Sequence, residues 1–380
     1  MQGSLLPLYI IERGFSNKVA GLTSTAYMLA SVLLRPVSGR MTDKSGRYGV
    51  AIFGAVIYCV ATGLYFFAVP VTLLIVMRIV QGVGFSFDST GAYVLATDNI
   101  PESRMAEGLG YLGCSQTVAI ALAPMIAISL KNSFGYKTAF MTIFTLSALV
   151  PIIILLLRFI ITRTFKPAAV VRRARLHTTV FPAKREPILS MIVDKNALKP
   201  ALLMLLVMFA GMTTSIFLAP YATISGIANP GLFFTVQAVM AFAARLTMGK
   251  IQQRVGASTV LILGMLLIFC GLFGLVLRVS LPILVICGVL YGLGIGVVQP
   301  QLSALAMLAA GKDNRGKATS TFFMMMDGGS AACGFIFGAI ADTAGYVSIF
   351  AIAAAIALGT LFLYIVMQKK IGVSHNAKAL

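Results

Sequence analysis

The chain reads as a series of long apolar segments separated by short polar stretches. Eleven segments reach the roughly 17–25 residues that a helix needs to cross a bilayer core. They cover residues 19–39, 48–68, 72–97, 105–130, 136–160, 198–219, 230–249, 257–277, 282–309, 317–341 and 346–368. An open strand would leave backbone groups unpaired in lipid, and a β-barrel would show short alternating segments. The pattern therefore predicts an all-α protein that crosses a membrane many times.

The hydrophobic pattern repeats at an offset of 210 residues. Arg35, Gly39, Gly46, Gly82 and Gly84 fall on Arg245, Gly249, Gly256, Gly292 and Gly294. Parallel repeats of this kind are one way in which secondary transporters are built. The repeat predicts an N-terminal bundle over 1–160, a basic cytoplasmic linker over 161–197, a C-terminal bundle over 198–368 and a cytoplasmic tail over 369–380.

The first apolar stretch, up to Ile11, is shorter than the others and would form about 16 Å of helix, roughly half of a bilayer core. By the repeat, segment 198–219 pairs with a helix that starts upstream of Met1. We therefore expect an incomplete first helix, eleven complete spans, and a natural protein that extends upstream.

Composition supports a membrane protein, because 11% of residues are charged, against about 25% in soluble proteins. The net charge of +19 would by itself point to nucleic acid. With both ends placed in the cytoplasm, however, the outer side receives only Arg13, Lys18, Lys131, Lys137 and Arg278 of the 30 basic residues. This asymmetry predicts a cell (inner) membrane protein whose C-terminus is cytoplasmic and whose basic residues meet anionic head groups, with no nucleic-acid partner.

A short motif, Gly39-Arg-Met-Thr-Asp43-Lys44-Ser-Gly46-Arg47, follows the second span. It resembles the signature loop of the major facilitator superfamily, G-x-x-x-D-[RK]-x-G-R. The resemblance extends over essentially the whole chain and implies two six-helix bundles, related by a pseudo-two-fold axis, that give alternating access to a central site. It also implies that Asp43 acts as a conformational latch to the eleventh helix, with Asp98, Glu102 and Arg104 as the partner cluster.

Two further motifs resemble those of proton-linked members of the family. Arg78-Ile-Val-Gln81-Gly82-Val-Gly84 resembles the element R-x-x-Q-G-x-G. An arginine within a span is costly, so it should face protein or water, although it could instead extend to the interface. In the fifth span Gly110 and Pro124 align with an antiporter motif, of which three glycines are replaced by Ala119, Ala123 and Ala127. The replacements keep small size but weaken the inference of antiport.

Acidic residues deep in the spans are the strongest candidates for proton coupling. Only Asp88 and Asp327 lie well inside spans, each on a helical stripe of small or polar residues. Burial raises a carboxyl pKa towards neutral, which suits a group that binds and releases a proton. Asp327 could instead be a packing residue, and Gln116, near its repeat position, is a further polar candidate.

These observations predict a secondary transporter, most similar to the branch of the family that exports drugs or metabolites in exchange for protons. Its partners would be a small-molecule substrate and protons, with no cofactor or metal, and it would be a monomer. A proton-coupled nutrient importer would use the same residues. A non-transporting sensor or scaffold is a different class, but the central loop and tail leave little room for a signalling domain. An enzyme is not expected, because the spans hold no histidine and no metal-ligand pair.

Overall fold

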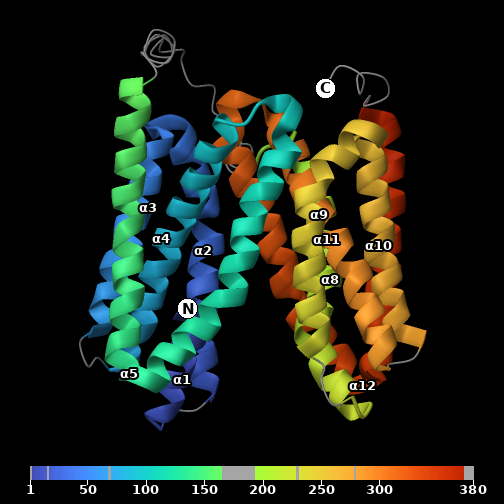
Figure 1. Ribbon diagram of the computed structural model, residues 1–380, viewed down its shortest axis with the longest axis horizontal. Helices are drawn as coiled ribbons and strands as arrows, with labels where there is room; N and C mark the ends of the chain where they lie inside the picture. The colour runs from blue at the N-terminus through green and yellow to red at the C-terminus, as the bar shows by residue number, and fades with distance from the viewer. Residues whose placement is uncertain are drawn as a thin grey trace. The chain divides into compact units, whose positions relative to one another are not determined.

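The computed structural model describes residues 2–14, 17–66, 70–164, 193–227, 231–277 and 280–371, and the regular elements in these ranges are all helices (Figure 1). The α-helices are α1 (Gln2–Glu12), α2 (Asn17–Ser45), α3 (Arg47–Gly63), α4 (Val71–Asp98), α5 (Met105–Thr164), α8 (Leu198–Ile224), α9 (Gly231–Val255), α10 (Ala257–Leu277), α11 (Leu281–Ala310) and α12 (Arg315–Ile371). Three 3-10 turns are η1 (Leu64–Phe66), η2 (Glu102–Arg104) and η3 (Lys312–Asn314). Most of the predicted linker and tail lies outside the described residues.

Two of these elements, α5 and α12, each contain two successive spans. The helix is interrupted at Gly135 (φ 79°) in α5 and at Gly345 (φ 76°) in α12. Residues other than glycine rarely adopt a positive φ, so the chain can turn there between spans. The breaks fall in the gaps between the predicted spans, and they are themselves 210 residues apart.

Eight helices in the described part of the chain are long and apolar enough to cross a bilayer, by length and composition. They are Thr72–Asp98, Ser129–Ile160, Leu198–Ala222, Gly231–Val255, Ala257–Leu277, Leu281–Ala310, Lys312–Ala341 and Thr343–Gln368. The other three predicted spans, in α2, in α3 with η1 and at the start of α5, are helical where they are described but are not among the eight. Helix α3 ends at Gly63 and is 17 residues long, so it is a shorter apolar helix than the eight.

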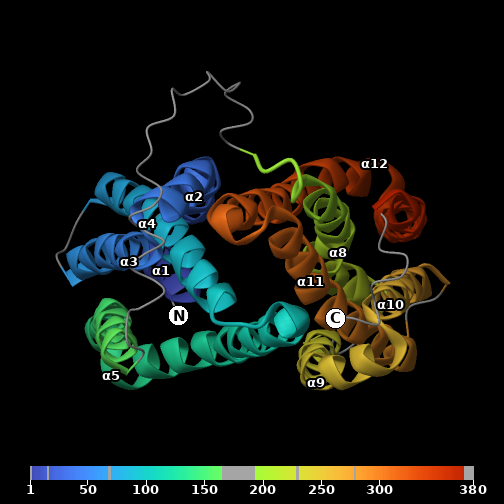
Figure 2. The same ribbon diagram turned by 90° about the horizontal axis from the view of Figure 1, so that it is seen from above.

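The chain divides into two compact units. Unit 1 comprises Met1–Ala96, Leu122–Lys195 and Asp313–Thr321, and unit 2 comprises Thr97–Ala121, Asn196–Lys312 and Phe322–Leu380. Each unit is thus drawn mainly from one half of the chain, together with one short segment from the other half. In unit 2, α11 packs against α8, α9 and α10 (Figure 2). The domain boundaries proposed from the sequence remain predictions.

Glycine contacts in the two units confirm the repeat. A Cβ atom on Gly82 would come within 2.3 Å of the Tyr27 carbonyl oxygen, and one on Gly292 within 2.5 Å of the Gln237 carbonyl oxygen. Both the glycines and their neighbours are 210 residues apart. Close approach of the backbones therefore requires glycine at the same place in each unit.

Buried arginines repeat in the same way. In unit 1, Arg35 donates a hydrogen bond from Nη1 to Ser89 Oγ (3.2 Å). In unit 2, Arg245 donates from Nη2 to Gln299 Oε1 (3.0 Å). These pairs are again offset by 210 residues, so the two halves share the connection between their second and fourth helices as well as their backbone packing.

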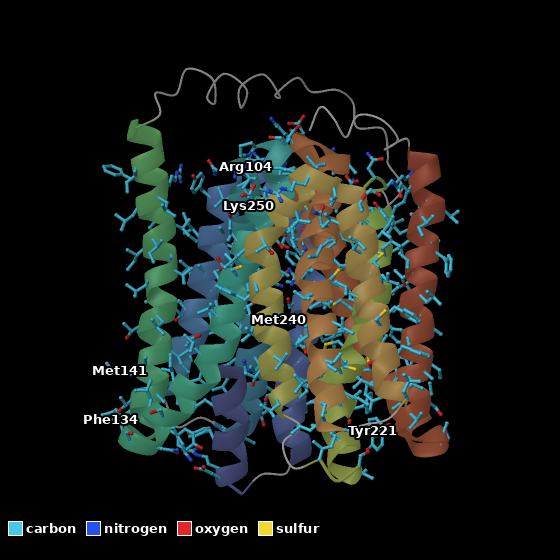
Figure 3. All side chains as sticks on the ribbon, turned by 45° about the vertical axis from the view of Figure 1, so that its right-hand side comes forward. Arg104, Phe134, Met141, Tyr221, Met240 and Lys250 are labelled. Atoms are coloured by element: carbon cyan, nitrogen blue, oxygen red, sulfur yellow. The ribbon has the colours of Figure 1, made fainter. Side chains whose placement is uncertain are left out.

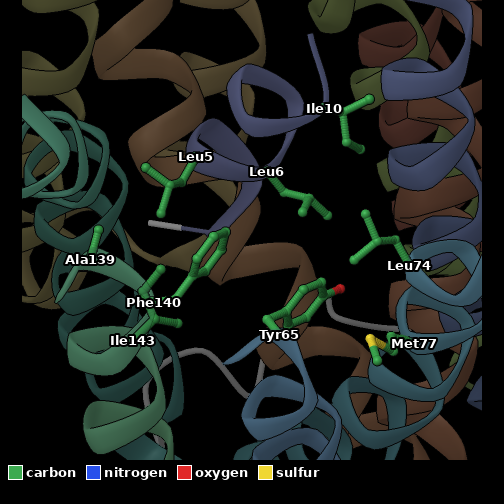
Figure 4. Packing of buried hydrophobic residues seen from close by; sticks show 9 residues of the cluster. All are labelled: Leu5, Leu6, Ile10, Tyr65, Leu74, Met77, Ala139, Phe140 and Ile143. Carbon is green, nitrogen blue, oxygen red and sulfur yellow. The ribbon is translucent and has the colours of Figure 1, made fainter. Parts of the chain in front are cut away.

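Apolar side chains both fill the core and cover the outside of the molecule. One core cluster of unit 1 comprises Leu5, Leu6, Ile10, Tyr65, Leu74, Met77, Ala139, Phe140 and Ile143 (Figure 4). On the outer side of α5, Phe134 and Met141 point away from the helices and are 69% and 56% exposed (Figure 3). Large apolar side chains on the surface are expected where helices face lipid.

Candidate functional site

The carboxylate of Asp43, near the end of α2, caps the first turn of α12. Its two oxygens accept hydrogen bonds from the backbone N–H groups of Gly316 (2.8 Å) and Lys317 (2.9 Å). The first N–H groups of a helix have no partner within the helix, and the helix dipole favours a negative charge there. Gly39 lets the two helices meet, since a Cβ atom would come within 2.4 Å of Ser320 Oγ. The signature motif thus joins α2 to α12, the contact that the family resemblance implies for Asp43.

The remaining residues of the motif form the turn from α2 into α3. Gly46 has φ 91°, a conformation that favours glycine. Lys44 is exposed and Arg47 is half-buried. Their role in a conformational latch remains a prediction.

Burial raises the pKa of Asp43 above its ordinary value, although the two N–H groups and the neighbouring Arg47 and Lys317 act in the opposite direction. The raised pKa reflects the cost of burying the charged form, which outweighs the hydrogen bonds that favour it. By linkage, the folded state in which Asp43 is buried gains stability as pH falls through the interval between the ordinary and the raised pKa, and loses it as pH rises, whereas the two hydrogen bonds themselves are stronger with the charged carboxylate.

We expect Asp43→Asn, which keeps one of the two acceptor oxygens, to be less harmful than Asp43→Ala, which keeps neither. Alanine leaves two helix N–H groups without their cap, which costs about 0.5–2 kcal/mol. Thermal unfolding of the purified protein, followed with a thiol-reactive dye on its free cysteines, measures the difference. Ser45→Ala, an exposed change on the same helix, is the control. Equal unfolding temperatures for Asp43→Ala and Ser45→Ala would show that the cap contributes nothing.

The cluster expected around Asp98 and Arg104 has local partners in unit 2. Arg104 donates from Nε and Nη2 to the two carboxylate oxygens of Glu107, each at 2.8 Å. Glu102 lies 3.4 Å from Lys312 Nζ. Glu107 was not singled out from the sequence, and it packs against Gly249, the repeat counterpart of Gly39. Arg104 and Lys250 lie at one end of this unit and Tyr221 at the other (Figure 3). The latch role of Asp98 and Arg104 remains a prediction.

A buried polar cluster surrounds Arg78 in unit 1. We call it the Arg78 cluster, and its members are Gln2, Tyr58, Thr62, Tyr65, Arg78 and Gln81. Arg78 is 4% exposed, so it lies inside the protein rather than extending to the interface. Its Nη1 donates to Gln81 Oε1 (3.5 Å) and its Nη2 to the Gln2 carbonyl oxygen (3.3 Å), and its guanidinium lies 5.6 Å from the Tyr27 ring centre.

Gln81 connects the helices of this cluster. Its Nε2 donates to Gln2 Oε1 (3.0 Å) and to Thr62 Oγ1 (2.9 Å), while its Oε1 accepts from the Tyr65 hydroxyl (3.2 Å). The Tyr58 hydroxyl also donates to Gln2 Oε1 (3.2 Å). Sequence reasoning found Arg78 and Gln81 but missed their partners on α1, α3 and η1. A polar pair one helical turn apart in an apolar segment, Tyr58 and Thr62, was the available signal.

Asp88 lies on α4, ten residues beyond Arg78. It is partly buried, and its Oδ1 atom is shielded from solvent and has no hydrogen-bond partner among the described residues. Its backbone nitrogen packs against Gly54 of α3, where a Cβ atom would approach to 2.2 Å. This arrangement provides a carboxylate on a closely packed stretch of backbone, with no ion pair to another described side chain. A role of Asp88 in proton transfer remains a prediction.

The candidates of unit 2 are more dispersed. Asp327, on α12, is partly buried, whereas Gln116, on α5, is exposed. Gly110 lies close to α9, since a Cβ atom there would lie 3.1 Å from Met248 Cε, and its role in an antiporter motif remains a prediction. Pro124, the other residue of that motif, belongs to unit 1, and its side chain lies outside those described. Within the described residues, no three His, Cys, Asp or Glu side chains are grouped so that they could hold a metal ion.

Comparisons with known proteins place these features in a family. The model of the Major Facilitator Superfamily matches residues 1–228 and 201–379. The chain is similar to the staphylopine export protein of Staphylococcus aureus, with 25% identity over 90% of this chain and 85% of that protein. The fold is similar to a bacterial homologue of the iron transporter ferroportin in an outward-facing state, with a TM-score of 0.75, 16% identity and coverage of 97% and 96%. It is also similar to the proton:xylose symporter XylE, with a TM-score of 0.72, 13% identity and coverage of 95% and 88%.

Proposed function

Because this chain belongs to the major facilitator superfamily, it is a multi-pass membrane transporter and not an enzyme, and we propose that it exports a small molecule in exchange for protons. The observation that carries the proposal is Asp88, a shielded carboxylate with no hydrogen-bond partner at Oδ1 in the described part of the chain. Such a group can bind and release a proton without first breaking a salt bridge. The Staphylococcus aureus relative, named as an export protein, supports the direction.

In this proposal Asp88 carries the proton, and Arg78 supplies a fixed positive charge on the same helix. Asp43, capping α12, stabilises the outward-open conformation, together with Asp98 and Arg104. Asp327 and Gln116 are secondary candidates for the polar path. The proton gradient is the energy source, so no cofactor is required. The transporter lies in the cell membrane as a monomer, with its C-terminus and most basic residues on the cytoplasmic side, next to anionic head groups.

Proton-coupled uptake is the second candidate. Ala119, Ala123 and Ala127 replace glycines of the antiporter motif, and the same acidic residues would serve a symporter. The two candidates differ in the direction of the substrate relative to the protons. In export the substrate and the protons cross the membrane in opposite directions, and in uptake they cross in the same direction.

Everted membrane vesicles that contain the protein test both candidates. A pH gradient, acid inside, is established and followed with a pH-sensitive dye while a library of small molecules is added outside. Export in exchange for protons predicts that a transported compound dissipates the gradient, because it enters as protons leave. Control vesicles lack the protein. If no compound alters the gradient, but labelled compounds are transported without one, proton coupling is wrong.

A further inference from the structure

The Arg78 cluster occurs in one repeat only. At an offset of 210 residues, the six members correspond to Met212, Ile268, Leu272, Leu275, Gly288 and Tyr291. Yet the backbones pack alike in the two units, because Gly84 approaches the Gly54 carbonyl oxygen just as Gly294 approaches the Gly264 carbonyl oxygen. The helices therefore pack without the polar side chains. A buried arginine at a position where the other repeat has glycine points to a function beyond packing.

The contacts of Arg78 are weak for a buried arginine. Its two hydrogen bonds are 3.3 Å and 3.5 Å long, whereas a guanidinium and a carboxylate are typically about 2.7–2.9 Å apart. Both acceptors are neutral amide oxygens, and in the described part of the chain Arg78 makes no ion pair. A buried positive charge without a counter-ion is costly. An incoming anion would replace these long contacts with stronger ones.

Two N–H donors of the cluster lack an acceptor among the described residues. They are Arg78 Nε and Gln2 Nε2, both fully shielded from solvent. The orientation of the amides follows from the network: Gln81 Oε1 must accept from Arg78, so Gln81 Nε2 donates, and Gln2 Oε1 must accept. The Gln2 amide nitrogen is therefore a donor without an acceptor. Among the described residues, other arginines have an Nε atom that is shielded in the same way, namely Arg47, Arg245 and Arg315. The distinctive feature of the cluster is therefore that two such donors belong to one group of side chains and could both donate to an added acceptor.

We propose that the Arg78 cluster binds a carboxylate group of the transported substrate. A carboxylate offers two negatively charged acceptor oxygens, which match the planar N–H groups of arginine and can also accept from an amide. A neutral acceptor would satisfy the hydrogen bonds but not the charge. The inference rests on the proposed function and adds the chemical class of the substrate.

The carboxylate site is distinct from the proton site. Asp88 lies ten residues after Arg78 on α4, which corresponds to about 15 Å along a helix. A substrate carboxylate bound at Arg78 therefore need not displace the proton from Asp88 by direct contact.

The test uses the purified full chain and matched pairs of probes. Benzoate, 4-phenylbutyrate, succinate and glutamate are each compared with the corresponding amides, and binding is read from the rise in unfolding temperature with concentration. We expect at least one carboxylate to stabilise the protein and its amide not to do so. Arg78→Gln should weaken that carboxylate by about tenfold or more, because a charge-assisted pair is lost. Arg35→Gln, which removes a buried arginine elsewhere in unit 1, should bind it normally.

Milder variants keep the test decisive if Arg78→Gln does not fold. Arg78→Lys keeps the charge but loses the paired donors, and Gln2→Met introduces the side chain found in the other repeat. Each should weaken carboxylate binding severalfold. Failure of all four carboxylates to bind, or binding that these variants leave unchanged, would overturn the inference.

The outcome is separate from that of the transport proposal. If carboxylates bind in an Arg78-dependent manner but no pH-driven transport occurs in vesicles, the inference stands and proton coupling fails. If neutral or cationic compounds are transported and carboxylates do not bind, the transport proposal stands and the inference fails.

Discussion

Replacing Asp88 by asparagine is expected to abolish transport driven by a pH gradient while the protein remains folded. Asparagine has nearly the same shape as aspartate but cannot bind or release a proton, so the proton could no longer be exchanged for substrate. The Oδ1 atom of Asp88 has no hydrogen-bond partner in the described part of the chain, and therefore little stability should be lost. In vesicles with a pH gradient, the variant should transport no more than vesicles without the protein.

Exchange of labelled for unlabelled substrate provides the complementary measurement. Such exchange needs no net proton movement, so Asp88→Asn should retain it if the substrate site is intact. Asp313→Asn, an exposed change in η3, controls for the loss of one carboxylate. Asp327→Asn tests the second candidate. Full pH-driven transport by Asp88→Asn, with a loss in Asp327→Asn, would transfer the proton-carrier role to α12.

The helical architecture could be predicted from hydrophobic pattern because each span must satisfy its own backbone hydrogen bonds in lipid. The repeat predicted more, since shared glycines imply shared helix contacts, and Gly82 and Gly292 meet equivalent carbonyl groups. The exact ends of the helices were less predictable. The segment predicted over 48–68 forms a helix only to Gly63, because the chain then tightens into η1.

The site could be predicted only in part, because a motif identifies residues but not their partners. The signature loop indicated Asp43 and the helix it meets, whereas the motif around Arg78 left open whether the arginine faces protein or water or extends to the interface. The partners of Gln81 come from three other elements, and no spacing in the sequence brings Gln2 next to it. Glu107 was missed because its importance comes from contact with Gly249, which lies far away in the sequence.

The second large effect is expected from adding one methyl group at Gly54. A Cβ atom there would lie 2.2 Å from the Asp88 backbone nitrogen and 2.6 Å from the Gly84 carbonyl oxygen. Both are backbone atoms, so α3 and α4 must separate to accommodate it. Overpacking of this kind costs about 1–3 kcal/mol. We expect Gly54→Ala to lower the unfolding temperature of the purified protein, and also to reduce transport, because the displaced segment of α4 carries Asp88.

Two other glycines make the comparison specific. Gly49 is on the same helix and has open space around its Cβ position, so Gly49→Ala should leave stability unchanged or raise it by about 0.5–1 kcal/mol, since alanine favours helix. Gly264, the repeat counterpart of Gly54, would meet the Val298 side chain at 2.9 Å, and a side chain can move where a backbone cannot. Gly264→Ala should therefore fall between the other two. If Gly54→Ala were as stable as Gly49→Ala, then α3 would not hold Asp88 in place by backbone contact, and the position of Asp88 would have to be fixed from elsewhere in unit 1.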